Sequence, residues 1–145
     1  MITILCVGKI KESYLNDMIN DYKKRISKYE KIEIIEVKDN VDIEKETQEL
    51  KKYINSKDYI ITLEIEGKNF TSEEFAKRLD NIYLTNSHIT FVIGSSNGLS
   101  DEIKKQANLA LSFSSFTFPH GLFRAILLEQ IYRAFKINNN ESYHK

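Results

Sequence analysis

The sequence predicts an α/β fold in which a single domain, residues 1–145, contains a parallel sheet covered by helices. Five short segments rich in apolar and β-branched residues alternate with five segments of helical periodicity, a pattern typical of a parallel sheet with helices on both faces. The composition agrees, because 145 residues that are 41% hydrophobic and 29% charged suit one globular domain. No apolar stretch approaches the roughly 20 residues that span a bilayer, so no membrane partner is expected.

Three strands and two helices are predicted in the first half of the chain. Residues 2–8 form a short apolar run that ends on glycine, which indicates a buried strand. Apolar residues then recur at helical spacing over residues 14–29. Residues 31–38 partly alternate and are β-branched, so they predict a second strand. A weaker, highly charged helix over residues 41–54 precedes the third strand, residues 58–67.

The second half repeats the alternation. The sequence TSEE opens residues 71–83 with a capping-box pattern, which predicts a helix. The fourth strand is residues 88–94, and Ser100 is expected to cap the helix that follows. Residues 109–114 predict the fifth strand. Pro119, the only proline of the chain, then opens the last helix, because proline favours the first helical position.

Three loops are the expected ligand site, because open α/β sheets bind ligands at the carboxyl ends of their strands. These loops follow residues 63–65, Gly94 and residues 112–113. The loop from Gly94 to Gly98 contains small residues, but it lacks the lysine of a phosphate-binding loop and the third glycine of a dinucleotide fingerprint. An ordinary tight turn explains it equally well.

The segment SFSSFTFPH, residues 112–120, runs from the fifth strand into the last helix without a glycine. Proline biases the preceding residue toward an extended backbone, so we expect a taut connection with exposed backbone groups. Such groups could bind an adenine edge, with Phe113, Phe116 and Phe118 as pocket walls. The alternative is that the three rings are simply core.

The last helix and the tail that follows it hold further candidates. The broad apolar stripe of the helix suggests contact on more than one side, as in a dimer. Glu129 and Arg133 have the spacing of a surface salt bridge, whereas Arg124 lacks a partner on the helix and is expected to face the crevice and contact an anion. The final residues, Tyr143-His144-Lys145, are either a frayed tail or, if docked, a group that can move a proton near neutral pH.

Charge and cysteine content narrow the functional classes. The net charge is zero, so charge alone does not indicate a nucleic-acid-binding protein, and no DNA partner is expected. Lys23, Lys24, Arg25 and Lys28 form either a solvated helix face or a local basic patch. Cys6 is expected to be a buried strand residue. A single cysteine permits no internal disulfide, which fits a reducing cytoplasm, and no metal is expected.

Four stretches in this order resemble the RlmH family: TLEIEGK, FVIGSSNGLS, LSFSSFTFPHGLFRAILLEQIYRAFKI and the final YHK. The family comprises SPOUT-class methyltransferases that act on ribosomal RNA of the large subunit. The resemblance extends from Met1 to Lys145. Three residues depart from the usual family pattern: Ser95 stands where a second glycine is common, Gly121 where glutamine is expected, and Glu64 where aspartate is commoner.

The resemblance implies a trefoil knot in the C-terminal part and a homodimer with its active site at the interface. It also implies that S-adenosylmethionine binds in a bent conformation. The implied methyl acceptor is N3 of a pseudouridine in helix 69 of 23S rRNA, within the assembled 70S ribosome. Carried over by position, the donor contacts are Leu63, Gly94, Phe113, Ser114, Ser115, Phe116, Thr117 and Phe118.

The catalytic roles expected on this basis begin with His144 as proton acceptor or base-positioning group, with Tyr143 stacking or hydrogen-bonding. Arg124 and Lys145 would contact phosphate or the developing negative charge, and His120 is a second candidate base. Two other functions remain open from the residues alone. One is a nucleotide-binding module without chemistry, and the other is a small dimeric adaptor.

Overall fold

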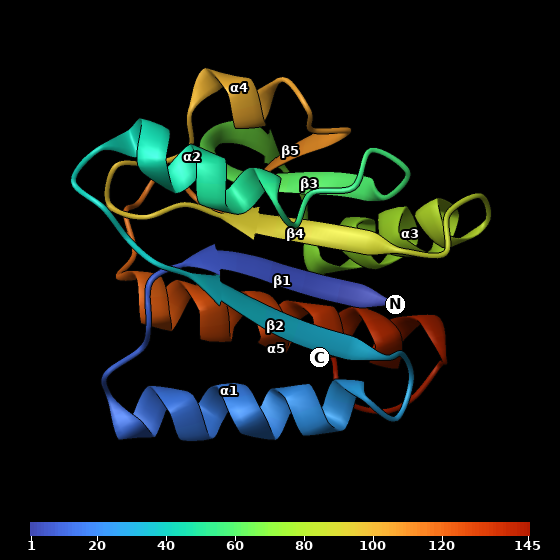
Figure 1. Cartoon of the computed structure of the whole chain (residues 1–145). Coiled ribbons are helices and arrows are strands. Elements are labelled where there is room, and N and C mark those ends of the chain that lie inside the picture. Colours follow the sequence, from blue (N-terminus) through green and yellow to red (C-terminus); the bar gives the residue numbers. More distant parts are fainter.

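Five parallel strands pair in the order β2-β1-β4-β3-β5 in the computed structural model, which describes residues 1–145 (Figure 1). Strand β4 is therefore at the centre of the sheet, between β1 and β3. This arrangement confirms the predicted parallel α/β sheet. The strands are β1 Ile2–Val7, β2 Ile32–Val37, β3 Tyr59–Asn69, β4 Ile89–Ile93 and β5 Leu109–Ser112.

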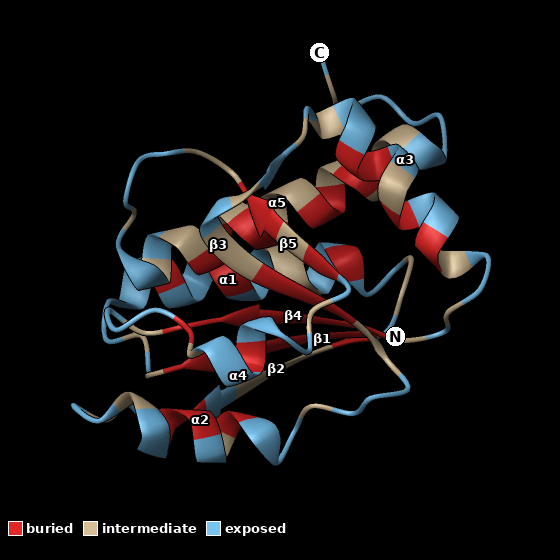
Figure 2. Cartoon of the chain, turned by 90° about the horizontal axis from the view of Figure 1, so that it is seen from above, coloured by how far each residue is buried: buried red, intermediate tan, exposed pale blue.

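Five helices cover the two faces of the sheet. Helices α1, α3 and α5 lie on one face and α2 and α4 on the other, as Figures 1 and 2 show from two directions. None of the five combines the length and apolar character of a membrane-spanning helix. The helices are α1 Ser13–Ile26, α2 Ile43–Lys51, α3 Ser72–Tyr83, α4 Asp101–Lys104 and α5 His120–Asn138.

Strand β1 shows why both faces need cover. All six of its residues are buried. Ile2, Ile4 and Cys6 join the larger core cluster beneath α1, α3 and α5. Leu5 and Val7 point the other way, into the smaller cluster beneath α2 and α4. Successive side chains of a strand alternate between faces, so a continuous apolar run requires a helical layer on each side.

Helix α5 packs between α1 and α3 and against the sheet. Contacts within one chain therefore explain the broad apolar surface of α5, since Leu127, Leu128 and Ile131 are completely buried. The predicted contact on more than one side is confirmed, since α1 and α3 both pack on α5, and the dimer stays a prediction. Leu122, near the helix start, stays 37% exposed.

Two boundaries differ from the prediction in ways that shape the site. Helix α5 begins at His120, with Pro119 as its N-cap residue, one position later than expected. Strand β3 extends to Asn69 because it pairs with β5 again after a shift of register between Leu63 and Lys68. Residues 64–67, between these two pairings, do not pair with β5 and lie toward the carboxyl end of β3. The trefoil knot stays a prediction.

Candidate active site

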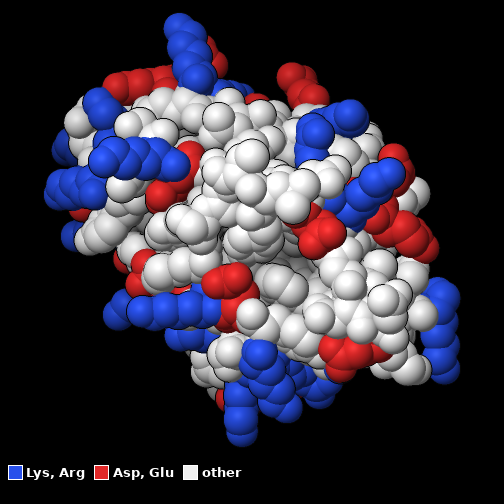
Figure 3. All heavy atoms as spheres, turned by 90° about the vertical axis from the view of Figure 1, so that its right-hand side faces the viewer, with Lys and Arg blue, Asp and Glu red and all other residues white.

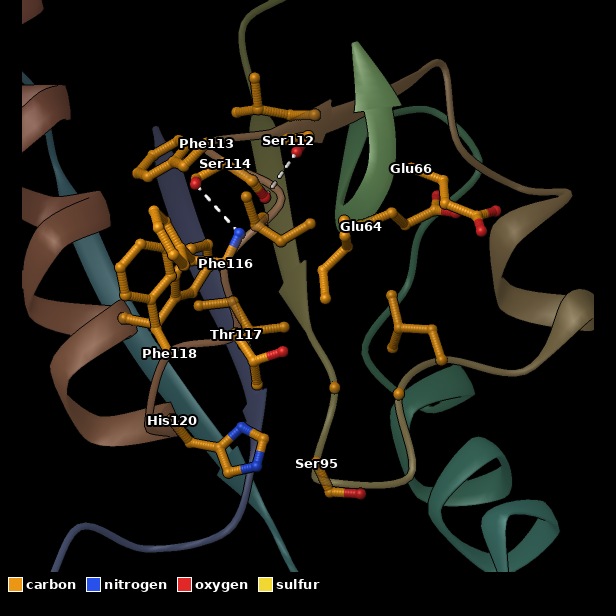
Figure 4. Close-up of a pocket in the computed structure, with 18 of the residues that line it drawn as sticks. Glu64, Glu66, Ser95, Ser112, Phe113, Ser114, Phe116, Thr117, Phe118 and His120 are labelled. Atoms are coloured by element: carbon orange, nitrogen blue, oxygen red, sulfur yellow. Dashed lines mark hydrogen bonds between the residues drawn. The ribbon is translucent and has the colours of Figure 1, made fainter. Parts of the chain in front are cut away.

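A cavity of about 570 Å³ opens at the carboxyl ends of β3, β4 and β5 (Figure 4). This volume lies within the range of about 300–1,000 Å³ that is usual for small-molecule sites. The three loops singled out by the strand-end rule all contribute to it. Residues 63–66 come from the β3 irregularity, residues 93–99 from the loop after β4, and residues 111–123 from β5, its connection to α5 and the helix start.

Most of the expected donor contacts meet in this cavity. Ser115 is the exception, because it does not line the cavity. Whether the others bind a donor stays a prediction. Those that do line it are Leu63, Gly94, Phe113, Ser114, Phe116, Thr117 and Phe118.

The loop after β4 needs glycine for an internal reason. A Cβ atom at Gly94 would lie 2.5 Å from the carbonyl oxygen of Gly98, so a side chain there would force the loop apart. Gly98 itself has φ of +72°, a conformation that non-glycine residues rarely adopt. The turn therefore requires glycine at both positions before any ligand is considered, Gly94 for its small size and Gly98 for its backbone conformation.

The connection from β5 to α5 is held by its own hydrogen bonds. The hydroxyl of Ser112 donates to the carbonyl of Ser114 at 3.2 Å, and the backbone N–H of Phe116 donates to the hydroxyl of Ser114 at 3.0 Å. Phe113 and Phe118 pack on Phe123, with ring centroids 5.2 and 5.8 Å apart. Phe116, in contrast, is 78% exposed. The three alternating rings are thus not equivalent, because two are packed and one is free.

His120 lines the cavity from the first turn of α5 (Figure 4). Its imidazole is exposed and makes no hydrogen bond within the chain. The first turn of α5 holds no acidic residue, and no side chain caps it. The His120 ring is therefore free to contact a bound molecule.

The C-terminal tail is docked. Tyr143 packs edge-on against Tyr132 at 4.9 Å and donates its hydroxyl to Glu129 at 3.0 Å. Burial raises the pKa of the Tyr143 phenol, and its hydrogen bonds add to the shift. Glu129 also pairs with Arg133 at 2.5 Å, which confirms the predicted helix salt bridge.

His144 is held between two charged side chains. Its Nδ1 lies 3.0 Å from a guanidinium nitrogen of Arg133, and its Nε2 lies 2.5 Å from Glu73 at the start of α3. The hydrogen bond to His144 lowers the pKa of Glu73. The frayed-tail interpretation is therefore wrong for this structure.

The docked tail does not reach the cavity of its own chain. None of Tyr143, His144 and Lys145 lines it. The cavity uses His120, at the start of α5, whereas the tail packs near Tyr132. At 1.5 Å per residue, these two positions are about 18 Å apart along the helix axis. The expected cooperation of His144 with the donor-contact residues does not occur within one chain.

Comparison with known proteins assigns the chain to a family. The family described as "Predicted SPOUT methyltransferase" matches residues 1–144. Proteins called ribosomal RNA large subunit methyltransferase H are 49% identical to the chain in both Natranaerobius thermophilus and Clostridium botulinum. The two alignments cover 97% and 99% of this chain and the same shares of the relatives. The chain belongs to the RlmH family of SPOUT methyltransferases.

A solved structure supports the fold of this RlmH-family chain. A probable methylase family protein from Haemophilus influenzae matches 99% of this chain and 70% of its own length, with a TM-score of 0.61. At 13% identity the similarity concerns the fold alone.

Arg124 does not have the position that was expected of it. Its side chain is buried, does not line the cavity, and pairs with Glu36 of β2 at 2.5 Å. It also donates to the carbonyl oxygen of Gly8 at 3.2 Å. The search for a partner on its own helix missed Glu36, because a buried guanidinium takes its carboxylate from wherever the fold supplies one. In this RlmH-family chain Arg124 ties the first turns of α5 to the sheet.

Sequence reasoning missed Glu46, which does not line the cavity but bonds to Ser95 of the loop that does. It is 2% exposed and accepts hydrogen bonds from the Ser95 hydroxyl at 2.6 Å and the Asn40 backbone N–H at 2.9 Å. Asn97 approaches the same carboxylate at 3.4 Å. Glu46 thus fastens the glycine loop of the cavity to α2. The available signal was its spacing, since Glu46 lies four residues before buried Leu50 and so on the inner face of the helix.

Proposed function

We propose that this chain is an S-adenosylmethionine-dependent methyltransferase that modifies ribosomal RNA of the large subunit. The acceptor in this proposal is N3 of a pseudouridine in helix 69 of 23S rRNA, on the assembled 70S ribosome. One observation carries it: seven of the eight expected donor contacts, distant in sequence, line a single cavity in a member of a methyltransferase family. The name shared by its relatives supports ribosomal RNA as the substrate.

The cavity fits the proposed donor. Phe113 and Phe118 supply a packed aromatic wall for a purine, and the hydrogen-bonded turn at Ser114 places backbone groups beside it. Bound S-adenosylmethionine supplies an already activated methyl group. The protein therefore has two tasks, which are to align acceptor and donor and to accept the proton that leaves N3.

Two histidines are candidates for the proton. His120 is in the cavity and free of hydrogen bonds, so it can accept a proton from a base stacked at the cavity mouth. His144 is oriented by Arg133 and Glu73, but it belongs to a tail that packs near Tyr132, about 18 Å from His120 along the helix axis. A role for His144 therefore requires a second chain.

A homodimer satisfies this requirement. In a two-fold interface the start of α5 in one subunit can meet the end of α5 in the other, and symmetry makes that contact twice. Each tail would then serve the cavity of the partner subunit. Exposed apolar side chains beside the start of α5 favour this arrangement, with Leu122 at 37%, Met18 at 37% and Tyr14 at 69% exposure.

Local basic side chains are the proposed contact to RNA phosphates. Lysine and arginine side chains gather at the lower edge of Figure 3, the side that α1 occupies in Figure 1. The last turn of α1 carries Lys23, Lys24 and Arg25. Arg25 is engaged with Asp21 at 3.2 Å, which leaves the lysines free for phosphate.

The test uses 70S ribosomes from a strain that lacks this enzyme. The protein is incubated with them and labelled S-adenosylmethionine, and the modified nucleoside is identified by mass spectrometry. N3-methylpseudouridine is the expected product. Transfer to a different nucleoside would contradict the proposed acceptor, and donor binding without any transfer would favour a binding module. Absence of both binding and transfer would favour a dimeric adaptor.

A further inference from the structure

The cavity has an acidic side. Glu64 and Glu66 belong to the stretch of β3 that leaves the ladder, and Figure 4 shows them across the cavity from Phe113 and Phe118. Lys104 is the one lysine or arginine that lines the cavity. Two carboxylates therefore face one ammonium group, so the lining carries a negative charge.

Glu64 is the better placed of the two carboxylates. Its side chain is 17% exposed and accepts a hydrogen bond from the Thr62 hydroxyl at 2.6 Å. The ammonium group of Lys104 lies at 3.9 Å, the outer limit for an ion pair, and is itself 43% exposed. Glu66 is exposed, so water and salt screen its charge. Glu64 is thus fixed in place and only weakly neutralised.

A second negative charge lies behind the glycine loop. The buried carboxylate of Glu46 bonds to neutral donors, among them the Ser95 hydroxyl that lines the cavity, and it has no cationic partner. Charges in a partly buried site are screened less than those on the surface, so both carboxylates act on a bound molecule. This arrangement favours a ligand with positive charge.

We propose that Glu64 makes the cavity select the cationic methyl donor over the neutral product left after transfer. This inference rests on the proposed function. In the transfer the bond from sulfur to methyl breaks, its electrons stay on sulfur, the bond from N3 to methyl forms, and the N3 proton passes to a base. The sulfonium becomes a thioether, so the net charge of the ligand falls from +1 to zero. The attraction to Glu64 is lost at that moment, which favours release of the product.

The expected size of this selection follows from Coulomb's law. At an effective dielectric constant of about 20, unit charges several ångströms apart interact strongly enough to change binding by about tenfold or more. The neutral product lacks the sulfonium charge, so its binding does not include this attraction. The ratio of the two dissociation constants therefore isolates the effect of charge from the effect of shape.

The experiment measures dissociation constants of S-adenosylmethionine and S-adenosylhomocysteine by calorimetry for the intact protein and three variants. Glu64→Gln removes the charge but keeps an oxygen that can accept from Thr62. We expect it to weaken binding of the methyl donor about tenfold and to leave binding of the product nearly unchanged. Glu64→Asp keeps the charge and should preserve the preference. Glu44→Gln removes an exposed carboxylate of α2 outside the cavity and should change neither constant.

Three outcomes would overturn the inference. Equal weakening of both ligands by Glu64→Gln would mean that Glu64 acts only on the shape of the cavity. If Glu64→Gln changed neither dissociation constant, the charge of Glu64 would have no effect on ligand binding. Failure of the unmodified protein to bind either ligand would remove the proposed function itself, and with it this selection.

Discussion

The guanidinium of Arg124 donates to the carboxylate of Glu36 at 2.5 Å and so joins the first turns of α5 to the end of β2. The two partners are unequally exposed, because the side chain of Arg124 is 4% exposed and that of Glu36 is 33% exposed. This difference in exposure determines which of the two side chains can be replaced at the lower cost in stability. Glu36 can be hydrated without Arg124, whereas Arg124 would remain a buried, uncompensated charge without Glu36.

Glu36→Ala is therefore expected to destabilise the protein by about 3 kcal/mol, and Arg124→Met by clearly less. Methionine fills most of the volume of arginine without a charge. Urea unfolding monitored by circular dichroism gives both values. Equal costs for the two variants would show that the pair acts symmetrically, contrary to the exposure difference.

Glu46→Gln should weaken binding of the methyl donor several-fold and cost about 1–3 kcal/mol of stability. The amide that replaces one carboxylate oxygen cannot accept from Ser95 and from the Asn40 backbone at once, so the glycine loop loses its fixed position. Glu49→Gln is the matched control on the same helix, because Glu49 makes an exposed pair with Lys52 at 2.8 Å. Calorimetry and urea unfolding should show little change in the control, and similar behaviour of both variants would contradict the role of Glu46.

Deletion of residues 143–145 is expected to abolish methyl transfer while leaving donor affinity nearly unchanged. The expected donor contacts line the cavity of one chain without the tail, so we expect the deletion to affect transfer and not donor binding. Glu44→Gln provides the control, because Glu44 is exposed on α2 and lies outside both the cavity and the tail. Transfer to ribosomes at a comparable rate by the truncated protein would rule out a catalytic tail.

A mixture of two inactive proteins tests whether the tail acts across the dimer. One protein lacks residues 143–145 and the other carries Gly94→Val, which should force apart the loop that lines the cavity and so prevent donor binding, because a Cβ there meets Gly98 at 2.5 Å. In mixed dimers, the intact tail of the second protein can serve the intact cavity of the first. We expect activity to return on mixing. Persistent inactivity, with mixed dimers demonstrated by differential tagging, would show that the tail serves only its own chain.

Tyr83→Phe is expected to leave stability at neutral pH unchanged or slightly higher, because the Tyr83 hydroxyl is buried without a hydrogen-bond partner. Burial also raises the pKa of this phenol above the ordinary value of 10.0. The unfolded chain then loses the proton first as pH rises above 10, so the folded protein loses stability there. Urea unfolding from pH 8 to 11 should show a smaller loss for Tyr83→Phe than for the unmodified protein. Tyr53→Phe, at an exposed tyrosine, should follow the unmodified protein.

Local patterns were sufficient for the elements and for the cavity. The capping box at Thr71 is present as predicted, and the side chain of Ser100 caps α4. These features depend on residues only a few positions apart, so a sequence shows them directly. The loops of the cavity could also be predicted, because the carboxyl ends of parallel strands meet at one edge of the sheet whatever the strand order.

The chain by itself thus determined the alternation of five strands and five helices, the loops that meet at the cavity and, through its motifs, the family. Only the tertiary structure decided the partners of Arg124 and Glu46 and the place of the tail. Arg124 and Glu36 are 88 residues apart, and Glu46 and Ser95 are 49 apart. Such pairs form because a buried charge needs a hydrogen-bonding or oppositely charged partner, which comes from whichever segment the fold brings near. The periodicity of the sequence does not indicate which segment that is.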